Sequence, residues 1–311
     1  MCCLFGMIDC HRRFGAREKT HILSVLATEC EERGTDATGI AYCTHDHLSI
    51  YKRPLEAHRL RFRIPEDSRV IMGHTRMTTQ GKASRNKNND PFPGNAGGEQ
   101  FALAHNGILY NDQLLRRTNR LPKTKIETDS YIAVQLIEQK KALDFSSLKY
   151  MAEQVEGTFT FTVLDQQENL YFVKGDNPLC LYHYPRHGVY LYASTEAILM
   201  RALNLLRLPL GKPERIELDC GDILKITASG QQATASFNAS HLAQHWGYWP
   251  MMWSSREKQS GKDRTAEQEY LEELKSVACC YGFSPESVDR LLESGFSTDD
   301  IEEFLYEGAM Y

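Results

Sequence analysis

The residue best suited to chemistry in this chain is Cys2, which follows the initiator methionine directly. Cysteine is small enough for that methionine to be removed, which would make Cys2 the N-terminal residue. A thiol is a good nucleophile near neutral pH, and an α-amino group with a pKa of about 7.7–8 can act as its base. One residue would then supply both groups. Taken alone, however, a Met-Cys start is only an apolar beginning to a strand.

Further segments carry the polar residues that a nucleophilic cysteine needs. They follow Cys2 in the order Arg33-Gly34-Thr35-Asp36-Ala37-Thr38-Gly39, His74-Thr75-Arg76, His105-Asn106-Gly107-Ile108 and Glu127-Thr128-Asp129. Breaking a carboxamide requires donors that hold the oxyanion formed on the carbonyl oxygen. The side-chain amide of Asn106 and the unobstructed N–H of Gly107 are two such donors. The sequence therefore predicts an amide-cleaving site built on Cys2, Asn106 and Gly107.

In this order the five segments resemble the class II glutamine amidotransferase domain, an N-terminal-nucleophile hydrolase domain, over about residues 2–237. The resemblance implies that glutamine is held by its α-carboxylate and its α-ammonium. Bidentate Arg76 matches the first role and Asp129 the second. The implied sites are catalytic Cys2, Asn106 and Gly107, substrate-binding Arg76, Thr79 and Asp129, and supporting Arg33, His74 and His105, without proton transfer by either histidine. Because Asp129 also precedes a predicted helix, capping is its alternative explanation.

Three residues depart from the family pattern. Cys3 stands where the family usually has glycine, Met77 stands where glucosamine-6-phosphate synthase has tryptophan, and Gln80 replaces a common histidine. None of these changes removes a catalytic role. Together they bring strict specificity for glutamine into question, because they alter the predicted substrate pocket.

The apolar pattern indicates the elements that position these residues. We expect helices at 19–33, 130–139 and 195–205, and strands at 4–8, 40–43, 48–52, 70–72, 101–104, 158–164, 170–174, 180–184, 189–193, 215–218, 222–226 and 231–237. Two groups of strands separated by helices predict an α+β fold. With the family resemblance, the expected architecture is the four-layer αββα N-terminal-nucleophile hydrolase fold with a small C-terminal helical annex.

Composition excludes several classes of protein. No apolar run approaches the roughly 20 residues that cross a bilayer, and there is no secretory pattern at the start, so we expect a cytoplasmic protein without a membrane partner. The nine cysteines show no CxxC pair and no zinc spacing, which predicts reduced thiols, no metal and no cofactor. The basic stretch 52–63 lacks interleaved aromatic residues, so no nucleic-acid partner is expected.

The chain divides into three predicted parts. Residues 2–240 form the glutaminase domain, 241–264 form a tryptophan-rich segment and linker, and 265–311 form a small acidic helical module. In the module, twelve Asp or Glu stand against Lys275 and Arg290, a net charge of −10, and helices are expected at 265–281, from 284–285 to before Gly295, and from the cap at Ser297 onward. The last two helices faintly resemble a ubiquitin-associated module. Residues 244–311 are therefore expected to contact protein, either the body of the chain or a partner.

The function predicted from these residues is hydrolysis of the glutamine side-chain amide through a Cys2 thioester. Glutamate is released, and ammonia passes to an acceptor on another subunit, because the roughly seventy residues after the domain cannot hold a synthase domain. One alternative is a hydrolase of larger γ-glutamyl amides, which the altered residues Met77 and Gln80 allow. Another is a silent binding or regulatory protein, which would tolerate a damaged site.

Overall fold

The computed structural model describes residues 2–45, 47–244 and 284–298, together with residues 271, 274, 275, 278 and 301. The chain forms two compact units, Met1–Ala239 and Ser240–Tyr311. In the described part of the chain, no helix combines the length and the apolar character needed to span a bilayer.

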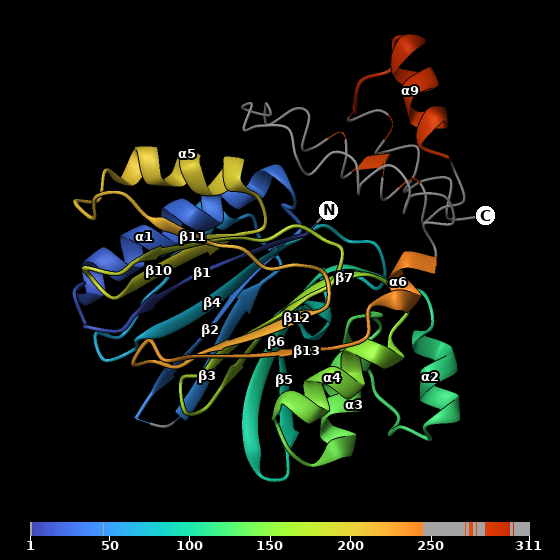
Figure 1. Cartoon of the computed structure of the whole chain (residues 1–311), viewed down its shortest axis with the longest axis horizontal. Helices are drawn as coiled ribbons and strands as arrows, with labels where there is room; N and C mark the ends of the chain where they lie inside the picture. Colours follow the sequence, from blue (N-terminus) through green and yellow to red (C-terminus); the bar gives the residue numbers. More distant parts are fainter. Residues whose placement is uncertain are drawn as a thin grey trace. The chain divides into compact units, whose positions relative to one another are not determined.

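Two antiparallel sheets form the centre of the first unit (Figure 1). The first consists of β1 (Cys3–Asp9), β2 (Ala37–Thr44), β3 (His47–Arg53), β4 (Val70–Arg76), β9 (Cys180–Tyr184), β10 (Val189–Ala193) and β11 (Glu214–Ile216). The second consists of β5 (Phe92–Ala96), β6 (Glu99–Leu109), β7 (Gly157–Asp165), β8 (Leu170–Lys174), β12 (Asp222–Ile226) and β13 (Gln232–Ser236). Their strand orders are β11-β9-β10-β1-β4-β2-β3 and β13-β12-β8-β7-β6-β5.

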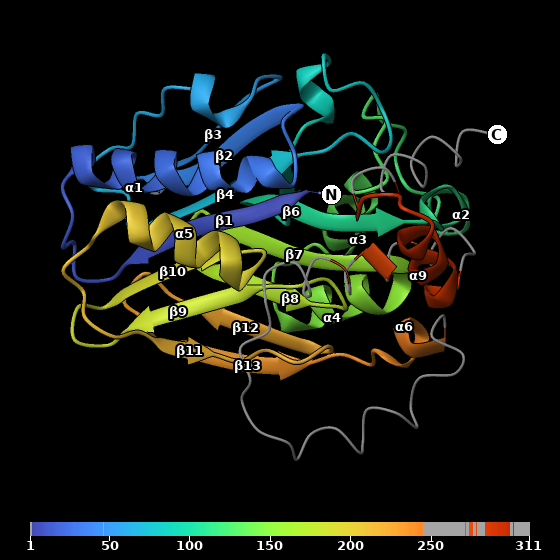
Figure 2. The ribbon, with the colours of Figure 1, turned by 90° about the horizontal axis from the view of Figure 1, so that it is seen from above.

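The alternation of side chains along each strand creates two cores. Leu4 and Ile8 of β1 lie between the sheets with Phe172 of the second sheet. Phe5 and Met7 of β1 face the other way and pack with apolar residues of helices α1 (Ala16–Glu29) and α5 (Glu196–Leu206). These two helices cover the outer face of the first sheet, as Figure 2 shows.

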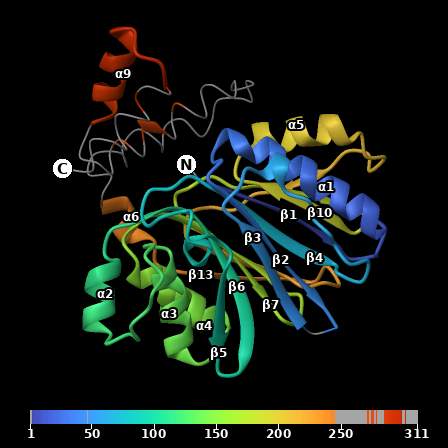
Figure 3. The ribbon, with the colours of Figure 1, turned by 180° about the vertical axis from the view of Figure 1, so that it is seen from behind.

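The outer face of the second sheet carries helices α3 (Tyr131–Lys140) and α4 (Phe145–Gln154), as seen from behind in Figure 3. The first unit thus has four layers in the order helices, sheet, sheet, helices, which confirms the predicted αββα architecture. Shorter elements join the layers: η1 (Cys30–Glu32), η2 (Ala57–Arg59), η3 (Asn86–Asn88) and α2 (Asp112–Thr118).

Local sequence explains where two of these helices begin. Thr195 precedes α5, and its hydroxyl accepts the N–H of Ile198 at 3.3 Å. Asp144 precedes α4, and its carboxylate accepts the N–H of Ser147 at 2.8 Å. Each side chain satisfies one of the N–H groups that a first helical turn leaves without a partner.

The expected strands and helices of the first unit are present, with corrections at several boundaries. The strand expected at 70–72 continues to Arg76, and the strand expected at 101–104 continues to Leu109. Both extensions are paired: β4 bonds to β1 and β2, and β6 stays in register with β7 as far as the pair Leu109 and Gly157. The polar residues at the ends of β4 and β6 therefore remain paired with the neighbouring strands. The predicted helix 19–33 ends at Glu29 and is followed by η1, while β5, α2 and α4 had no sequence prediction.

In the second unit, α6 spans Ser240–Gln244 and α9 spans Pro285–Glu293. Helix α9 confirms the expectation of a helix that starts at 284–285 and ends before Gly295. The Nζ of Lys275 lies 2.6 Å from the carboxylate of Asp289 in α9. The tryptophan-rich segment, most of the helix expected at 265–281, and Asp300 lie outside the described residues.

Candidate active site

The rows of side chains between the two sheets end in the predicted site residues. In β1 and β4 the even-numbered positions face the second sheet, and in β6 the even-numbered positions at 102 and 104 face the first. His74 and Arg76 continue the row of β4, Asn106 continues that of β6, and Cys2 precedes the row of β1. The period of two therefore directs all of these side chains toward the space between the sheets.

Cys2 lies beside His74 at this end of the sheets. The Cys2 Sγ is 3.5 Å from the carbonyl oxygen of Met77. Burial raises the pKa of the Cys2 thiol, but opposing effects, led by the charge and hydrogen bonding of His74, outweigh it and bring the pKa below its usual value. A lower pKa increases the share of thiolate, the nucleophilic form, at a given pH.

The orientation of His74 follows from its other contact. Its Nε2 lies 2.9 Å from the carbonyl oxygen of His105, so this nitrogen carries the proton and donates it. His74 Nδ1 is buried without a hydrogen-bond partner among the described residues. His105 is neutral, because burial lowers its pKa to about 3. Its Nε2 faces the carbonyl of Thr158 at 3.3 Å and its Nδ1 faces the Ser130 hydroxyl at 2.9 Å, so this ring supports the site.

Arg33 joins the nucleophile to the predicted oxyanion donor. Its Nε donates to the Cys2 carbonyl at 2.9 Å, and its Nη2 lies 3.5 Å from Oδ1 of Asn106. The guanidinium is a donor only, so it selects the oxygen of the Asn106 amide and turns the NH₂ away from itself. Gly34 allows the close approach of this segment, because a Cβ there would lie 2.5 Å from the main-chain carbon of Arg76.

Asn106 and Gly107 present the two donors expected from the sequence. Asn106 Nδ2 is buried and has no hydrogen-bond partner in the described part of the chain. A buried donor without a partner costs roughly 1–3 kcal/mol, which a bound oxygen would recover. Gly107 has a φ of 143°, and a Cβ there would lie 2.0 Å from the carbonyl oxygen of Thr158. Only glycine fits this backbone beside Asn106.

The N–H groups on either side of Gly107 are held by carboxylates. Alternate residues of a strand point their N–H groups in one direction. The N–H of His105 donates to Asp90 at 3.0 Å, and the N–H of Leu109 donates to Asp129 at 2.6 Å. Gly107 lies between these two residues and points its N–H to the same side. This edge of β6 therefore offers one N–H between two fixed acidic groups.

Arg76 and Asp129 are both buried near this edge. Arg76 donates to Oδ1 of Asn89 at 2.6 Å and to the carbonyl of Gln80 at 2.5 Å. Burial raises the pKa of Asp129 to about 6, against hydrogen bonds to its carboxylate from the backbone of Leu109 and of Ser130. Thr79 is exposed, and its hydroxyl has no hydrogen-bond partner among the described residues.

The structure clarifies two departures from the family pattern. Cys3 points to the opposite face of β1 from Cys2, and its Sγ lies 3.0 Å from that of Cys30 in η1. The Cys3 side chain is therefore part of the helix-covered core and does not line the site. Gln80 contacts Arg76 through its main-chain carbonyl, so this contact is independent of the side-chain type.

Sequence reasoning missed several residues that surround the site. They are Lys52, Asn89, Asp90 and Asn177. Burial raises the pKa of Asp90 to about 7, although the positive charges of Arg76 and Lys52 act to lower it. Lys52 donates to the carbonyls of Asn89 and Pro91 at 2.5 and 2.9 Å. The run Asn88-Asn89-Asp90 was a signal, since consecutive amide and carboxylate side chains in a buried loop need specific partners.

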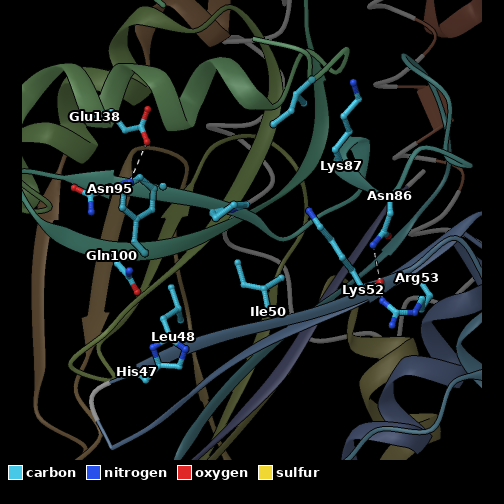
Figure 4. A pocket seen from close by; sticks show the side chains of 14 residues that line it. His47, Leu48, Ile50, Lys52, Arg53, Asn86, Lys87, Asn95, Gln100 and Glu138 are labelled. Atoms are coloured by element: carbon cyan, nitrogen blue, oxygen red, sulfur yellow. Dashed lines mark hydrogen bonds between the residues drawn. The ribbon is translucent and has the colours of Figure 1, made fainter.

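A separate cavity of about 720 Å³ lies between β3 and β5 (Figure 4). Basic, apolar and amide side chains line it, among them Lys52, Arg53, Lys87 and Ile50. None of the predicted site residues is part of its lining. Lys52 connects the cavity to the site. Its ammonium donates to the carbonyls of Asn89 and Pro91, and the side chain of the same Asn89 accepts from Arg76.

A family model and several curated proteins are similar to this chain. Residues 74–201 match the family model described as a glutamine amidotransferase domain. Curated relatives include the glutamine–fructose-6-phosphate aminotransferases of Chlamydia muridarum and Bacillus licheniformis, each 30% identical to this chain over 193 and 187 residues, respectively. The match covers 58% of this chain and 30% of each relative, so the chain spans about a third of the length of these proteins.

Solved structures share the fold at lower identity. One is the glutamine phosphoribosylpyrophosphate amidotransferase of B. subtilis, complexed with ADP and GMP, with a TM-score of 0.59 and 18% identity. Another is described as the allosteric regulatory enzyme of purine biosynthesis, with a TM-score of 0.61 and 19% identity. Each similarity covers 76% of this chain and 49% of the other. Residues 74–201 of this chain therefore carry a glutamine amidotransferase domain, on a fold that the chain shares with these solved amidotransferases.

Proposed function

We propose that this domain hydrolyses the side-chain amide of glutamine through a thioester on Cys2. The observation that carries the proposal is the buried Asn106 Nδ2, a donor with no partner among the described residues, next to Gly107 and near a thiol with a lowered pKa. An oxyanion in front of these donors would satisfy them both. The α-amino group of Cys2, freed by removal of the initiator methionine, is the proposed base.

The proposed reaction has two halves. The Cys2 thiolate attacks the amide carbon, and the carbonyl electron pair moves onto oxygen, where Asn106 and Gly107 hold the charge. The oxyanion collapses, the C–N bond breaks, and the nitrogen leaves as ammonia after taking a proton from the amine. Water then attacks the thioester, and glutamate leaves with the thiol restored.

The proposed substrate contacts use the two charged groups beside the donors. Arg76 binds the α-carboxylate through its guanidinium fork, and Asp129 binds the α-ammonium. The Asn89 side chain and the Gln80 carbonyl hold the Arg76 guanidinium, and Leu109 holds one oxygen of Asp129. We place Thr79 in the substrate pocket, as the family resemblance implies. Arg33, His74 and His105 keep their supporting roles in this proposal.

The decisive experiment is the release of glutamate from L-glutamine by the purified protein. We expect release by protein whose intact mass shows loss of the initiator methionine, and none by a Cys2→Ala variant. Equal release by both proteins would exclude the thioester route. No release by correctly processed protein would exclude free glutamine as a substrate that the chain hydrolyses unaided.

A γ-glutamyl amide is the second candidate substrate. Its support is Met77, which replaces a tryptophan and whose carbonyl lies 3.5 Å from the Cys2 sulfur. This contact uses the main chain of Met77 and is independent of its side chain. We propose that a side chain smaller than tryptophan at this position leaves more room around the leaving group. Comparing kcat/KM for glutamine and for γ-glutamyl-alkylamides of increasing size separates the two candidates. The intact set of site residues argues against a silent protein.

An ammonia acceptor on another subunit completes the proposal. The curated relatives are named as transferring an amino group from glutamine to fructose 6-phosphate, which supports a partner that uses the nitrogen. We propose a cytoplasmic location, in keeping with the free thiols of the described cysteines, which are Cys2, Cys3, Cys10, Cys30, Cys43, Cys180 and Cys220. Residues 244–311 remain a candidate surface for protein contact.

A further inference from the structure

A buried asparagine outside the predicted motifs holds the backbone of the oxyanion site. Asn177 follows β8 in the segment Gly175-Asp176-Asn177, and it is 5% exposed. Its Nδ2 donates to the main-chain carbonyl of Asn106 at 2.9 Å, across a separation of 71 residues. The same nitrogen is 2.7 Å from the place that a Cβ of Gly107 would occupy. Asn177 thus lies directly against the peptide that joins the two proposed donors.

This contact fixes the direction of a second group. In a trans peptide the C=O and the N–H point in opposite directions. The carbonyl of Asn106 points to Asn177, so the N–H of Gly107 in the same peptide points away from it. That direction is the edge of β6 where His105 and Leu109 donate to carboxylates. A rotation of this peptide would withdraw the Gly107 donor from the site.

The main chain of Asn177 is anchored independently of its side chain. Its carbonyl accepts the Thr160 hydroxyl at 2.6 Å, and its N–H donates to the carbonyl of Phe159 at 3.3 Å. Phe159 is the residue opposite Gly107 in the pairing of β6 with β7. Because Phe159 directs its carbonyl to Asn177 and its N–H to Asp176, it turns away from Gly107. Substitution of the Asn177 side chain leaves these main-chain anchors in place.

We propose that Asn177 is a positioning residue for the oxyanion hole. It holds the Asn106–Gly107 peptide in the one orientation that presents the Gly107 N–H to the developing oxyanion, without touching substrate itself. The inference rests on the proposed function, because it concerns the donors of that same reaction. Arg33 orients the side-chain donor of Asn106, and Asn177 orients the main-chain donor of Gly107, so the hole is held from two sides.

The test compares a ligand that forms an oxyanion with one that does not. Glutamate γ-semialdehyde adds the Cys2 thiol to its aldehyde carbon: a C–S bond forms, the C=O pair moves to oxygen, and that oxygen takes the thiol proton or stays charged in the hole. L-Norvaline carries the same α-amino and α-carboxylate groups but has no γ-oxygen. Both the C–S bond and the oxyanion hole raise the ratio of the norvaline inhibition constant to that of the semialdehyde, and a variant that leaves Cys2 intact changes this ratio only through the hole.

Two variants remove the donor in different ways. Asn177→Ala deletes the amide, and Asn177→Asp keeps its size but replaces the NH₂ by an acceptor. We expect both to weaken the semialdehyde by tenfold or more, within the roughly 10²–10³ range for loss of one donor, and to leave norvaline within about twofold. The kcat for glutamine should fall in parallel with the semialdehyde affinity, while KM changes little.

Asn111 provides a matched control. It is 7% exposed, and its Nδ2 donates to the main-chain carbonyl of Gln154 at 2.9 Å, so its burial and its bond resemble those of Asn177. Asn111→Ala should lower the melting temperature to a similar extent and leave the ratio of inhibition constants unchanged. An equal loss of the ratio in this control would overturn the inference, since any buried asparagine would then have the same effect.

The remaining outcomes separate the inference from the proposed function. If the wild-type protein binds the semialdehyde and both Asn177 variants keep the full ratio, Asn177 has no role in the hole. If both ligands weaken equally, its role concerns the whole pocket, which also contradicts the inference. If wild-type, processed protein fails to bind the semialdehyde more tightly than norvaline, the proposed thioester chemistry itself fails.

Discussion

The carboxylate of Asp129 accepts the backbone N–H of Leu109 at 2.6 Å, so one of its oxygens is occupied by the end of β6. This bond ties the turn before α3 to the strand that carries Asn106 and Gly107. It also places a buried carboxylate next to the proposed oxyanion donors. Burial raises the pKa of Asp129 to about 6, while the bonds from Leu109 and Ser130 act in the opposite direction.

This pKa predicts how substrate binding depends on pH. Below about pH 6 Asp129 becomes protonated and loses the charge that would pair with the α-ammonium of glutamine. We expect KM to rise by about tenfold for each pH unit below that point, because binding requires the ionised fraction. KM measured by glutamate release between pH 5 and 8 provides the test. An Asp129→Asn variant should show a high KM throughout, and a KM independent of pH in the wild type would contradict the assignment.

The same shift predicts a gain in stability when the charge is removed. Since the folded-state pKa of Asp129 is raised above its ordinary value, the stability of its protonated form is lost as pH rises from about 4 to about 6. At pH 7 the ionised group therefore lowers the free energy of unfolding. We expect Asp129→Asn to melt at a higher temperature than the wild type at pH 7 and to lose this advantage at pH 4. A lower melting temperature at pH 7 would show that the ionised form stabilises the fold.

Asn106 is predicted to contribute to the rate rather than to binding. Replacement by alanine removes the side-chain donor that has no partner among the described residues. We expect kcat to fall by about 10²–10³, with KM changed only a few-fold, since the oxyanion exists only along the reaction path. Steady-state kinetics on glutamine give both values. A loss confined to KM would place Asn106 in ground-state binding instead.

Arg76→Lys separates the charge of Arg76 from its geometry. The positive charge of lysine would still act to lower the pKa of Asp90. A lysine could not, however, donate to the Asn89 side chain and the Gln80 carbonyl and at the same time present two parallel N–H groups to a carboxylate. We expect KM for glutamine to rise about ten- to hundredfold, with a smaller effect on kcat. Arg53→Lys, at an exposed arginine that donates to the Lys52 carbonyl, serves as the control. Unchanged KM in Arg76→Lys would remove Arg76 from the carboxylate site.

The thiols near the N-terminus should differ in reactivity. Cys3 and Cys30 are 0% exposed and face each other, whereas Cys2 is partly exposed. The pKa of Cys2 and that of Cys3 are both lowered, so exposure is what separates these two thiols. Iodoacetamide should therefore alkylate Cys2 before the other two in the native protein, as mapped by peptide mass. His74→Gln should move the pH midpoint of Cys2 alkylation upward, because it removes the imidazole that lowers this pKa. Faster labelling of Cys3 or Cys30 would be incompatible with the packing of β1 on η1.

Much of the fold could be predicted, because the spacing of apolar residues and the residues that begin or end a helix are visible in the local sequence. The alternation in β1, β4 and β6 was visible in the apolar residues, and Thr195 marked the start of α5. The ends of β4 and β6 could not be predicted in the same way, since His74 and Asn106 are polar residues inside paired strands. Their pairing depends on neighbouring strands, which a local pattern does not contain. For the same reason β5 remained hidden within a loop rich in asparagine and glycine.

The sequence by itself determined which chemical groups are available: a thiol near the N-terminus, an Asn-Gly pair of donors, a guanidinium and a carboxylate. The tertiary structure decided how they are held. It brought Arg33 to both Cys2 and Asn106, placed Asn177 behind the peptide of Gly107, and turned Cys3 away toward Cys30. These contacts join residues that are far apart in the chain. They depend on the packing of the sheets, on the order of strands within the second sheet and on the packing of η1 against β1, and no spacing within a single segment specifies these arrangements.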